Sequence, residues 1–407
     1  MADPRIINQY DIPQRKDKFA VFDANFLQDV PHFVRQWNLK RIVLVCSTSL
    51  YAKYDHVQKL EAKLGEKVVG KKIGVGAHSP YSDVVEIAHL LQNTDADCLL
   101  SIGSSSYNDA SKIASKLANT LLPGSTDTDM EAIVDQEKGK ATTNDAKVKV
   151  IQAPTSLSAA EWNGTASATN SDGKKQHFGL ASHKEGAPDL IVMDPELAST
   201  APETLWLSSG VRCVDHCIEI ACNKDCKPED QAVALAGLSK MLKGLLQYKQ
   251  GIGEDRQKFV RGISEAQKGS REAIQALIVS NNTLGPSHAI GHQLGSVAGV
   301  MHGMTSCILL APTMRYSAET WPRTREVQAK ILKVFNETLG WQESNAADAL
   351  TKFVEQLGLP TRLSEVGVTD QPQIEKVAEK ALTDIWGGGK PQITEKEEVM
   401  KILNMVL

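Results

Sequence analysis

Short apolar runs alternate with amphipathic segments through the first half of the chain. Five runs are rich in aliphatic and β-branched residues and have the length of buried strands. They cover residues 40–47, 67–76, 97–103, 147–156 and 189–197. Between the second and third runs, residues 82–93 place apolar side chains at helical spacing. Strands that alternate with helices predict a parallel sheet with crossover helices.

The pattern changes after Pro195. Long segments rich in Ala, Leu, Lys and Glu follow, of which residues 229–250 are an example, and strand signals nearly disappear. Residues 358–368 have the composition of a connection between two helices. We therefore predict an α/β domain over residues 1–195 and an all-helical domain over residues 196–407.

Length, charge and cysteine content add to this division. A chain of 407 residues is too long for one compact core. Its formal net charge of −4 provides no large basic surface for nucleic acid or for an anionic membrane. No apolar run is long enough to cross a bilayer, and the first residues lack the apolar core of a secretion signal. Together with an odd number of cysteines, seven, these features predict a cytoplasmic protein with reduced thiols.

A turn of small residues follows the third predicted strand and opens a helix. It consists of Gly103, Ser104, Ser105 and Ser106, with Asp109 one turn further on. The N-terminus of a helix offers unpaired N–H groups at the positive end of the helix dipole, where a pyrophosphate can bind. A plain strand–helix connection, capped by Ser106 or Asp109, explains the same residues equally well.

Four of the ten histidines fall in two short segments of the second half. They are His216, His288, His292 and His302. Arg212 precedes His216 by four residues, so a helix would place both on one face. Imidazoles on facing helices commonly build a metal site or a proton relay. An arginine in the place where a metal site would use an acid is the unusual feature of this group.

Five motifs in order resemble those of the iron-containing alcohol dehydrogenase superfamily, from about Lys40 to the end. GSSSYNDASK (103–112) is similar to its Gly-Gly-Gly-Ser-x-x-Asp-x-Ala-Lys nucleotide loop, and PTSLSAAE (154–161) to its Pro-Thr-Thr loop. The remaining three are MDPEL (193–197), SGVRCVDHCIE (209–219) and HAIGHQLGSVAGVMHG (288–303). The short second loop has the length found in the maleylacetate reductases of this superfamily.

The resemblance implies a fold and a cofactor. Such proteins have a Rossmann-like dinucleotide-binding domain, a helical domain, a catalytic cleft between the two, and in many cases a homodimeric assembly. NADPH or NADH would lie over Gly103–Ser106, with Asp109, Thr155 and Ser156 nearby. The end of the first strand offers Ser47 where an NAD-selective enzyme would place an acid, and this permits NADPH.

The resemblance also places the metal ligands. In the superfamily they are an Asp, a His four residues on, and two later histidines, which correspond to Arg212, His216, His288 and His302. His292 corresponds to the histidine near the nicotinamide. Arg212 replaces an anionic ligand with a cation that is not deprotonated. We therefore predict that no metal is bound and that Arg212 polarises a carbonyl or binds a carboxylate or enolate, while the four histidines supply a proton.

These departures leave three hypotheses for the function. The first is a metal-independent NAD(P)H-dependent reductase of a small, anionic or enolisable carbonyl or enone compound. In the second, Arg212 forms a salt bridge with Asp215 or Glu219, and three histidines hold Zn²⁺ or Fe²⁺ in an alcohol dehydrogenase. In the third, the altered glycine triplet marks a lyase, isomerase or cyclase without redox chemistry.

Three further features have structural explanations. The cysteines at 213, 217, 222 and 226 fit a core-facing thiol stripe better than a metal site, because four ligands over four helical turns cannot reach one ion. Trp162 is equally compatible with stacking on a nicotinamide and with packing in the core. The polar stretch 124–145 reads as a loop without a motif.

Overall fold

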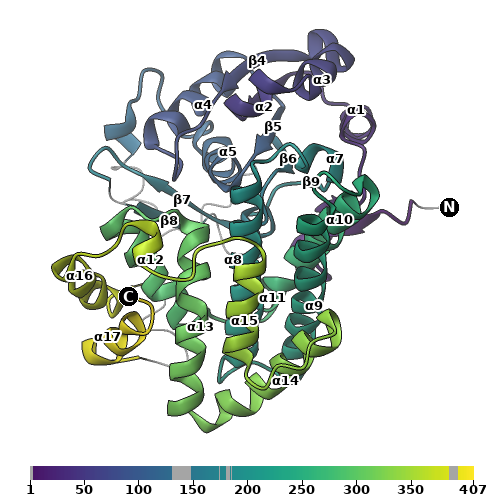
Figure 1. Cartoon of the computed structure of the whole chain (residues 1–407). Coiled ribbons are helices and arrows are strands. Elements are labelled where there is room, and N and C mark those ends of the chain that lie inside the picture. The colour runs from purple at the N-terminus through teal and green to yellow at the C-terminus, as the bar shows by residue number, and fades with distance from the viewer. Residues whose placement is uncertain (1–2, 131–147, 174, 180–183, 185, 385–392) are drawn as a thin grey trace. The chain divides into compact units, whose positions relative to one another are not determined.

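The computed structural model describes the chain except for residues 1–2, 131–147, 174, 180–183, 185 and 385–392 (Figure 1). Much of the predicted 124–145 loop therefore lies outside the described residues, and within its described part residues 127–130 are helical, contrary to the prediction. The chain divides into two compact units, Met1–Ala201 and Pro202–Leu407. None of the helices in the described part of the chain is long and apolar enough to span a membrane.

The first unit is built on a seven-stranded sheet with the order β1-β2-β9-β6-β5-β3-β4. All neighbouring strands are parallel except β1 and β2, which are antiparallel. The strands are β1 (Ile6–Asn8), β2 (Phe19–Val21), β3 (Ile42–Cys46), β4 (Val68–Ile73), β5 (Cys98–Gly103), β6 (Lys149–Pro154) and β9 (Leu190–Val192). A separate hairpin pairs β7 (Thr165–Thr169) with β8 (Lys175–Gly179). The predicted α/β fold is confirmed.

Helices cover both faces of this sheet, and the alternation of side chains along β3 shows why. Ile42, Leu44 and Cys46 join the core under α1, α2 and α3, whereas Val43 and Val45 face the core under α4 and α5. Every β3 side chain is therefore buried, as is usual for a central parallel strand. The helices are α1 (Phe26–Gln36), α2 (Thr48–Lys53), α3 (His56–Leu64), α4 (Tyr81–Asn93), α5 (Ser105–Leu117) and the short α7 (Pro195–Ala198).

The second unit contains helices and no strand among its described residues, as predicted. Its helices are α8 (Glu203–Cys222), α9 (Pro228–Gly251), α10 (Arg256–Ala273), α11 (Gln275–Ser280), α12 (Pro286–Ala298), α13 (His302–Thr320), α14 (Pro322–Leu339), α15 (Ala346–Gln356), α16 (Gln371–Ala381) and α17 (Lys396–Asn404). The predicted connection at 358–368 contains a single 3-10 turn, Ser364–Val366, between α15 and α16.

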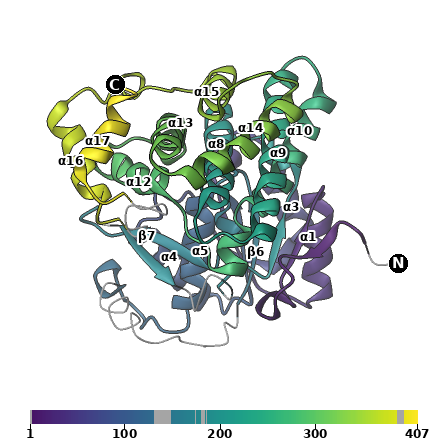
Figure 2. The ribbon, with the colours of Figure 1, turned by 90° about the horizontal axis from the view of Figure 1, so that it is seen from below.

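Helix α8 runs through the middle of this unit. Its residues from Trp206 to Cys222 are all buried. Both views place α9 and α10 on one side of α8, and α12, α16 and α17 on the other (Figures 1 and 2). Charged residues in α8 therefore lie inside the helical core, where each one needs a hydrogen-bonding or charged partner.

Candidate functional site

Arg212 occupies the centre of a buried polar cluster in the helical unit. It lies on α8, one turn before His216, and only 4% of its surface is exposed. Its Nη1 donates to the hydroxyl of Ser306 on α13 at 3.3 Å, and its Nη2 lies 3.3 Å from Nε2 of His292 on α12. A guanidinium has no acceptor, so the imidazole nitrogen accepts in the second contact.

The other nitrogen of His292 faces a carboxylate. Nδ1 of His292 lies 3.1 Å from Oδ2 of Asp384, and Gln293 also donates to this oxygen, at 2.9 Å. Because Nε2 accepts from Arg212, the proton of a neutral His292 sits on Nδ1 and is donated to Asp384. Arg212 is thereby connected to Asp384 through an imidazole.

A second carboxylate is connected to Arg212 through a hydroxyl. Ser306 accepts from Arg212 and donates to Oδ2 of Asp215 at 2.6 Å, and Ser287 donates to the same oxygen at 2.8 Å. Arg212 forms no direct ion pair with a carboxylate in the described part of the chain, so the alternative of a salt bridge to Asp215 or Glu219 is not what the structure shows. Burial lowers the pKa of Arg212, and the charges of Asp215, Glu219 and Asp384 oppose this shift.

Glu219 fixes the position of His288. Its carboxylate accepts from the backbone N–H groups of Gly285 at 2.7 Å and Ser287 at 2.6 Å, which lie at the N-terminus of α12. Nδ1 of His288, in the first turn of the same helix, lies 2.7 Å from Oε2 of Glu219. A Cβ atom at Gly285 would lie only 2.7 Å from Oε1 of Glu219, so a larger residue there would displace the carboxylate.

Neighbouring charges give two stacked histidines different proton affinities. The rings of His216 and His288 stack with centroids 4.7 Å apart. Burial, His288 and Arg212 hold the pKa of His216 well below its ordinary value. Burial and Arg212 also lower the pKa of His288, but Asp215 and Glu219 outweigh them and raise it. His216 is therefore the neutral member of the pair and His288 the better proton carrier.

His302 completes the group. It is the first residue of α13, and its ring stacks on His292 with centroids 5.5 Å apart. His288 and His292 lie edge to face at 6.4 Å. The structure thus brings together all five side chains that the sequence marks as catalytic, namely Arg212, His216, His288, His292 and His302; their roles remain predictions.

The cluster does not fit a divalent metal at the superfamily's ligand positions. Among the described residues, only Asp215, Glu219 and His288 form a group of three with ligand atoms within 4.8 Å of one another. In that group, Oδ2 of Asp215 accepts from Ser287 and Ser306, and both oxygens of Glu219 accept from the backbone at the start of α12. His216, His288 and His302 form no such group, and the Arg212 guanidinium, bonded to His292 and Ser306, adds a positive charge beside them.

In the first unit, the predicted nucleotide residues follow three neighbouring strands at one edge of the sheet. Ser47 follows β3 and accepts from the N–H of Leu50 as the cap of α2, and its own N–H donates to Ile102 of β5. Gly103 ends β5, and its carbonyl accepts from the N–H of Thr155, which follows β6. Ser156 comes next in this loop and is buried.

The three serines lie where the turn predicts them. Ser104 occupies the N-cap position of α5 without a side-chain capping hydrogen bond, and Ser104, Ser105 and Ser106 are partly exposed. A Cβ atom at Gly103 would lie 2.6 Å from the ring of Tyr107, so only glycine fits. Ser105 and Ser106 in the first turn of α5 are thus partly exposed, and the hydroxyl of Ser106 accepts from the N–H of His78 at 3.2 Å.

Asp109 supports this loop from behind. Its carboxylate pairs with Lys112 at 3.0 Å and accepts from the N–H of Ser167 on β7 at 3.0 Å. The Lys112 ammonium, which is also buried, donates to the carbonyls of Ala160, Asn163 and Thr165. These contacts tie α5 to the second loop, a structural role that the sequence did not indicate.

The structure settles two of the open alternatives. Trp162 is fully buried and stacks on Phe22 with centroids 5.8 Å apart, so it packs in the core. The four cysteines of α8 and its following turn are free and buried, as a core stripe requires.

Sequence reasoning missed the connecting residues Asp384, Ser306 and Ser287. Asp215 and Glu219 belong to the SGVRCVDHCIE motif, but the sequence suggested them only as salt-bridge partners of Arg212.

Comparisons with known proteins agree with this architecture. Residues 18–195 match the iron-containing alcohol dehydrogenase family, and residues 206–407 match the C-terminal part of the Fe-containing alcohol dehydrogenase family. The dehydrogenase ALT3 of Alternaria alternata is 30% identical over 89% of this chain and 98% of its own length. Maleylacetate reductase 1 of Rhodococcus opacus is 23% identical over 89% of this chain and 87% of its own length.

Solved structures share the fold. The maleylacetate reductase from Agrobacterium tumefaciens superimposes with a TM-score of 0.74 at 20% identity, over 95% of both chains. A 1,3-propanediol oxidoreductase gives a TM-score of 0.78 at 22% identity, over 95% of this chain and 97% of that one. The protein is thus an enzyme of the oxidoreductase type with maleylacetate reductase-like relatives. The chain belongs to the iron-containing alcohol dehydrogenase family.

Proposed function

We propose that this enzyme is a metal-independent, NAD(P)H-dependent reductase of a small carbonyl or enone compound that is anionic or enolisable. The observation that carries the proposal is the buried guanidinium of Arg212 at a position where other family members hold a metal ligand. A fixed positive charge in a water-poor site stabilises a developing oxyanion, which is the electrostatic work of a metal ion.

Arg212 retains donors for a substrate. Its hydrogen bonds to Ser306 and His292 use two of the five N–H groups of a guanidinium. Because Asp215 and Asp384 are reached only through Ser306 and His292, no carboxylate of the described residues competes directly for the remaining N–H groups. A carbonyl oxygen or a substrate carboxylate would accept from these groups.

His288 is the residue we assign as proton donor. Nδ1 is fixed by Glu219, and Nε2 is buried without a hydrogen-bond partner among the described residues. The raised pKa of His288 favours the doubly protonated ring, whose Nε2–H can then be given to the oxygen of the substrate. His216, held neutral, would stack on this ring and exclude water from it.

The nucleotide would bind the α/β unit over Gly103–Ser106 and the loop that contains Thr155 and Ser156. It supplies the hydride that reduces the substrate. An NADPH-dependent butanol dehydrogenase of Clostridium saccharobutylicum is 26% identical over 90% of this chain. Ser47 in place of an acid at the end of β3 leaves both NADPH and NADH as cofactors. A homodimeric assembly and a cytoplasmic location remain predictions from the resemblance and the composition.

A metal-dependent alcohol dehydrogenase is the second candidate, favoured by the family itself and by the three histidines at ligand positions. The two candidates differ in one assay. Protein purified without chelators is supplied with NADPH or NADH and with maleylacetate, lactaldehyde or butanal, before and after dialysis against EDTA. We expect oxidation of the nucleotide by at least one carbonyl compound, unchanged by EDTA. Activity that EDTA abolishes and Zn²⁺ or Fe²⁺ restores would establish the second candidate.

A further inference from the structure

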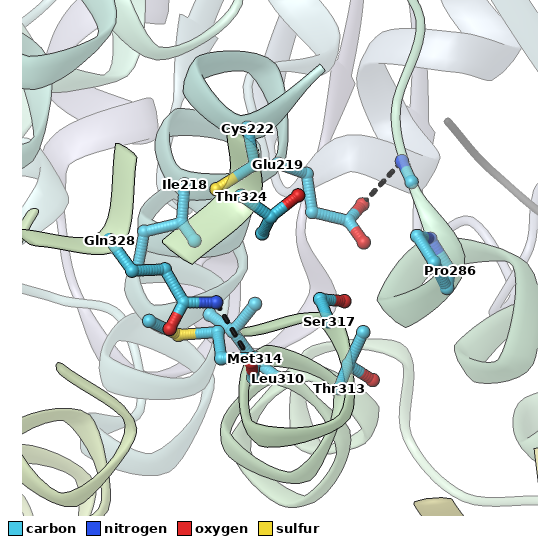
Figure 3. A pocket seen from close by; sticks show the side chains of 11 residues that line it. Ile218, Glu219, Cys222, Pro286, Leu310, Thr313, Met314, Ser317, Thr324 and Gln328 are labelled. Carbon is cyan, nitrogen blue, oxygen red and sulfur yellow. Dashed lines mark hydrogen bonds between the residues drawn. The ribbon is translucent and has the colours of Figure 1, made fainter. Parts of the chain in front are cut away.

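Buried polar atoms without a hydrogen-bond partner gather at one place in the α/β unit. In the pocket beside Glu219 of the helical unit, which Figure 3 shows, the hydroxyl of Thr313 is the one such atom on the described lining residues. Between helix α5 and the strands β5 and β6, four side chains contribute five such atoms, which we call the α5–sheet cluster. They are Oγ of Ser101, Oδ1 and Nδ2 of Asn108, Oγ of Ser111 and Oε1 of Gln152.

Strand register and helix packing bring these four side chains together. Ser101 on β5 pairs with Gln152 on β6, so both side chains leave the same face of the sheet. Helix α5 covers this face (Figure 1), and Nε2 of Gln152 donates to the backbone carbonyl of Asn108 at 2.9 Å. Ser111 follows Asn108 by three positions, so the two lie on one side of the helix. The α5–sheet cluster therefore forms one layer between a helix and the sheet.

The α5–sheet cluster is closed to solvent. All four of its side chains are 0% exposed, and its five atoms have no hydrogen-bond partner among the residues that the structure describes. Buried polar groups in native proteins almost always have a partner, and ordered water supplies it where the protein does not. Five unpartnered atoms in one layer therefore indicate a bound molecule.

The chemistry of the five atoms selects the class of this molecule. Nδ2 of Asn108 only donates, Oδ1 of Asn108 and Oε1 of Gln152 only accept, and the two serine hydroxyls can do either. A cation would leave the N–H groups of Asn108 without an acceptor. An anion would face the two amide oxygens, which repel it. A small neutral molecule that both donates and accepts satisfies the whole set, and water is the molecule that proteins commonly enclose in this way.

We propose that ordered water binds in the α5–sheet cluster and holds the start of α5 against the sheet. Ser101 precedes Gly103 by two positions, and Asn108 follows Ser106 by two. The water thus connects the end of β5 to the first turns of α5, on either side of the turn that would bind the nucleotide. Ser101 and Ser111 are then positioning residues for the nucleotide. This positioning role rests on the proposed function, whereas the bound water does not.

A high-resolution crystal structure of the wild-type protein tests the bound water directly. It should show water within hydrogen-bonding distance of Gln152 and Asn108. An empty cluster, or a cation in place of the water, overturns the proposal.

Ser111→Ala tests the same water through stability, with Ser115→Ala as the matched control. Both serines are buried on α5, so alanine changes the helix propensity equally at the two positions. The Ser115 hydroxyl donates to the carbonyl of Lys112 at 2.9 Å, and the control therefore loses one hydrogen bond. If water binds the Ser111 hydroxyl, Ser111→Ala also loses one and should melt no higher than Ser115→Ala. If the cluster is dry, Ser111→Ala loses none and melts above Ser115→Ala, which overturns the proposal.

The positioning role is tested by steady-state kinetics of Ser101→Ala/Ser111→Ala, with NADPH or NADH and a carbonyl compound that the wild-type enzyme reduces. The KM for the nucleotide should rise severalfold, whereas kcat and the KM for the carbonyl compound should stay close to wild type. Ser115→Ala should keep the wild-type KM for the nucleotide. An unchanged nucleotide KM in the double variant, or a fall in kcat alone, overturns the positioning role. If the wild-type protein binds neither nucleotide, the proposed function fails, and the crystal structure and the melting temperatures still decide the bound water.

Discussion

Nη2 of Arg212 and Nε2 of His292 lie 3.3 Å apart, and the direction of this hydrogen bond is fixed because arginine only donates. The contact orients His292 so that Nδ1 donates to Asp384. On the opposite side of the guanidinium, Ser306 makes the same kind of connection to Asp215. Arg212 is therefore held in place by two carboxylates, each acting through one intervening group.

The first prediction concerns Asp384. Asp384→Ala removes the acceptor for His292 and frees the imidazole to rotate away from Arg212. The resulting fall in kcat/KM should correspond to a loss of about 1.5–3 kcal/mol of transition-state stabilisation, the usual scale for a hydrogen bond to a charged group. Asp384→Asn keeps an acceptor oxygen and should lose less. The ¹⁵N NMR signals of His292 should report the Nδ1–H tautomer in wild type and a mixture in Asp384→Ala. Wild-type kinetics and an unchanged tautomer in Asp384→Ala would contradict this connection.

The second prediction concerns Gly285. A methyl group at this position would lie 2.7 Å from Oε1 of Glu219 and push the carboxylate off the N-terminus of α12. We expect Gly285→Ala to destabilise the protein by roughly 1–3 kcal/mol, because buried N–H groups lose their acceptor. Thermal unfolding measures this loss. Gly295→Ala is the matched control on the same helix, where the added methyl meets only a carbonyl oxygen at 3.3 Å. Equal melting temperatures for the two variants would show that the position of the Glu219 carboxylate does not require glycine at position 285.

The third prediction concerns the pH dependence of stability. Burial raises the pKa of Glu161 to about 7 from its ordinary value of 4.5, and neither carboxylate oxygen has a hydrogen-bond partner among the described residues. The unfolded chain releases this proton first, so the contribution of Glu161 to stability is complete below pH 4.5 and is lost as the pH rises through 7.

Glu161→Gln removes this dependence. The variant should be more stable than wild type by roughly 3–4 kcal/mol at pH 8, since the shift from 4.5 to about 7 spans about 2.5 pKa units of about 1.4 kcal/mol each, and should gain much less at pH 5. Urea unfolding at the two pH values measures the difference. Glu337→Gln, an exposed carboxylate on α14, serves as the control. A Glu161→Gln gain of equal size at both pH values would show that Glu161 does not titrate between them.

The fourth prediction concerns the nucleotide. Ser105 is the first residue of α5 and is partly exposed. Ser105→Trp should fill the approach to the helix N-terminus and weaken NADPH and NADH binding at least tenfold, about 1.4 kcal/mol. Quenching of protein fluorescence measures the affinity. Ser125→Trp, outside this loop, should bind as wild type does. Unchanged affinity in Ser105→Trp would place the nucleotide elsewhere.

Strands with a clear local sequence pattern were predicted, whereas strands held by pairing with distant residues were not. The strands β3 and β5 are continuous apolar runs, and both were predicted within a few residues. The strands β1 and β2 have three residues each and are held by pairing with β9, so no local pattern marked them. The predicted run at 189–197 ends as a strand at Val192, because Asp194 caps α7 with its side chain.

The same distinction applies to the site. Arg212, His216, His288 and His292 were found from helical spacing within two motifs, and His302 from its place in the second motif. Asp384 is separated from His292 by 92 positions in the chain, and only the packing of the helical unit brings the two together. Glu219 on α8 accepts from backbone N–H groups at the N-terminus of α12. This contact joins two helices, so the spacing of residues along either helix could not predict it.

The most direct test of the central claim is the metal content of wild type and Arg212→Asp, both purified without chelators and measured by inductively coupled plasma mass spectrometry. Arg212→Asp restores the superfamily's ligand set of one Asp and three histidines and removes the positive charge. We predict less than about 0.1 divalent metal per wild-type chain, about one Zn²⁺ or Fe²⁺ per Arg212→Asp chain, and loss of the native, EDTA-resistant activity in that variant. Arg212→Ala should bind little metal and lose about 2–4 kcal/mol of transition-state stabilisation. One metal per wild-type chain, held by His216, His288 and His302, would contradict the account.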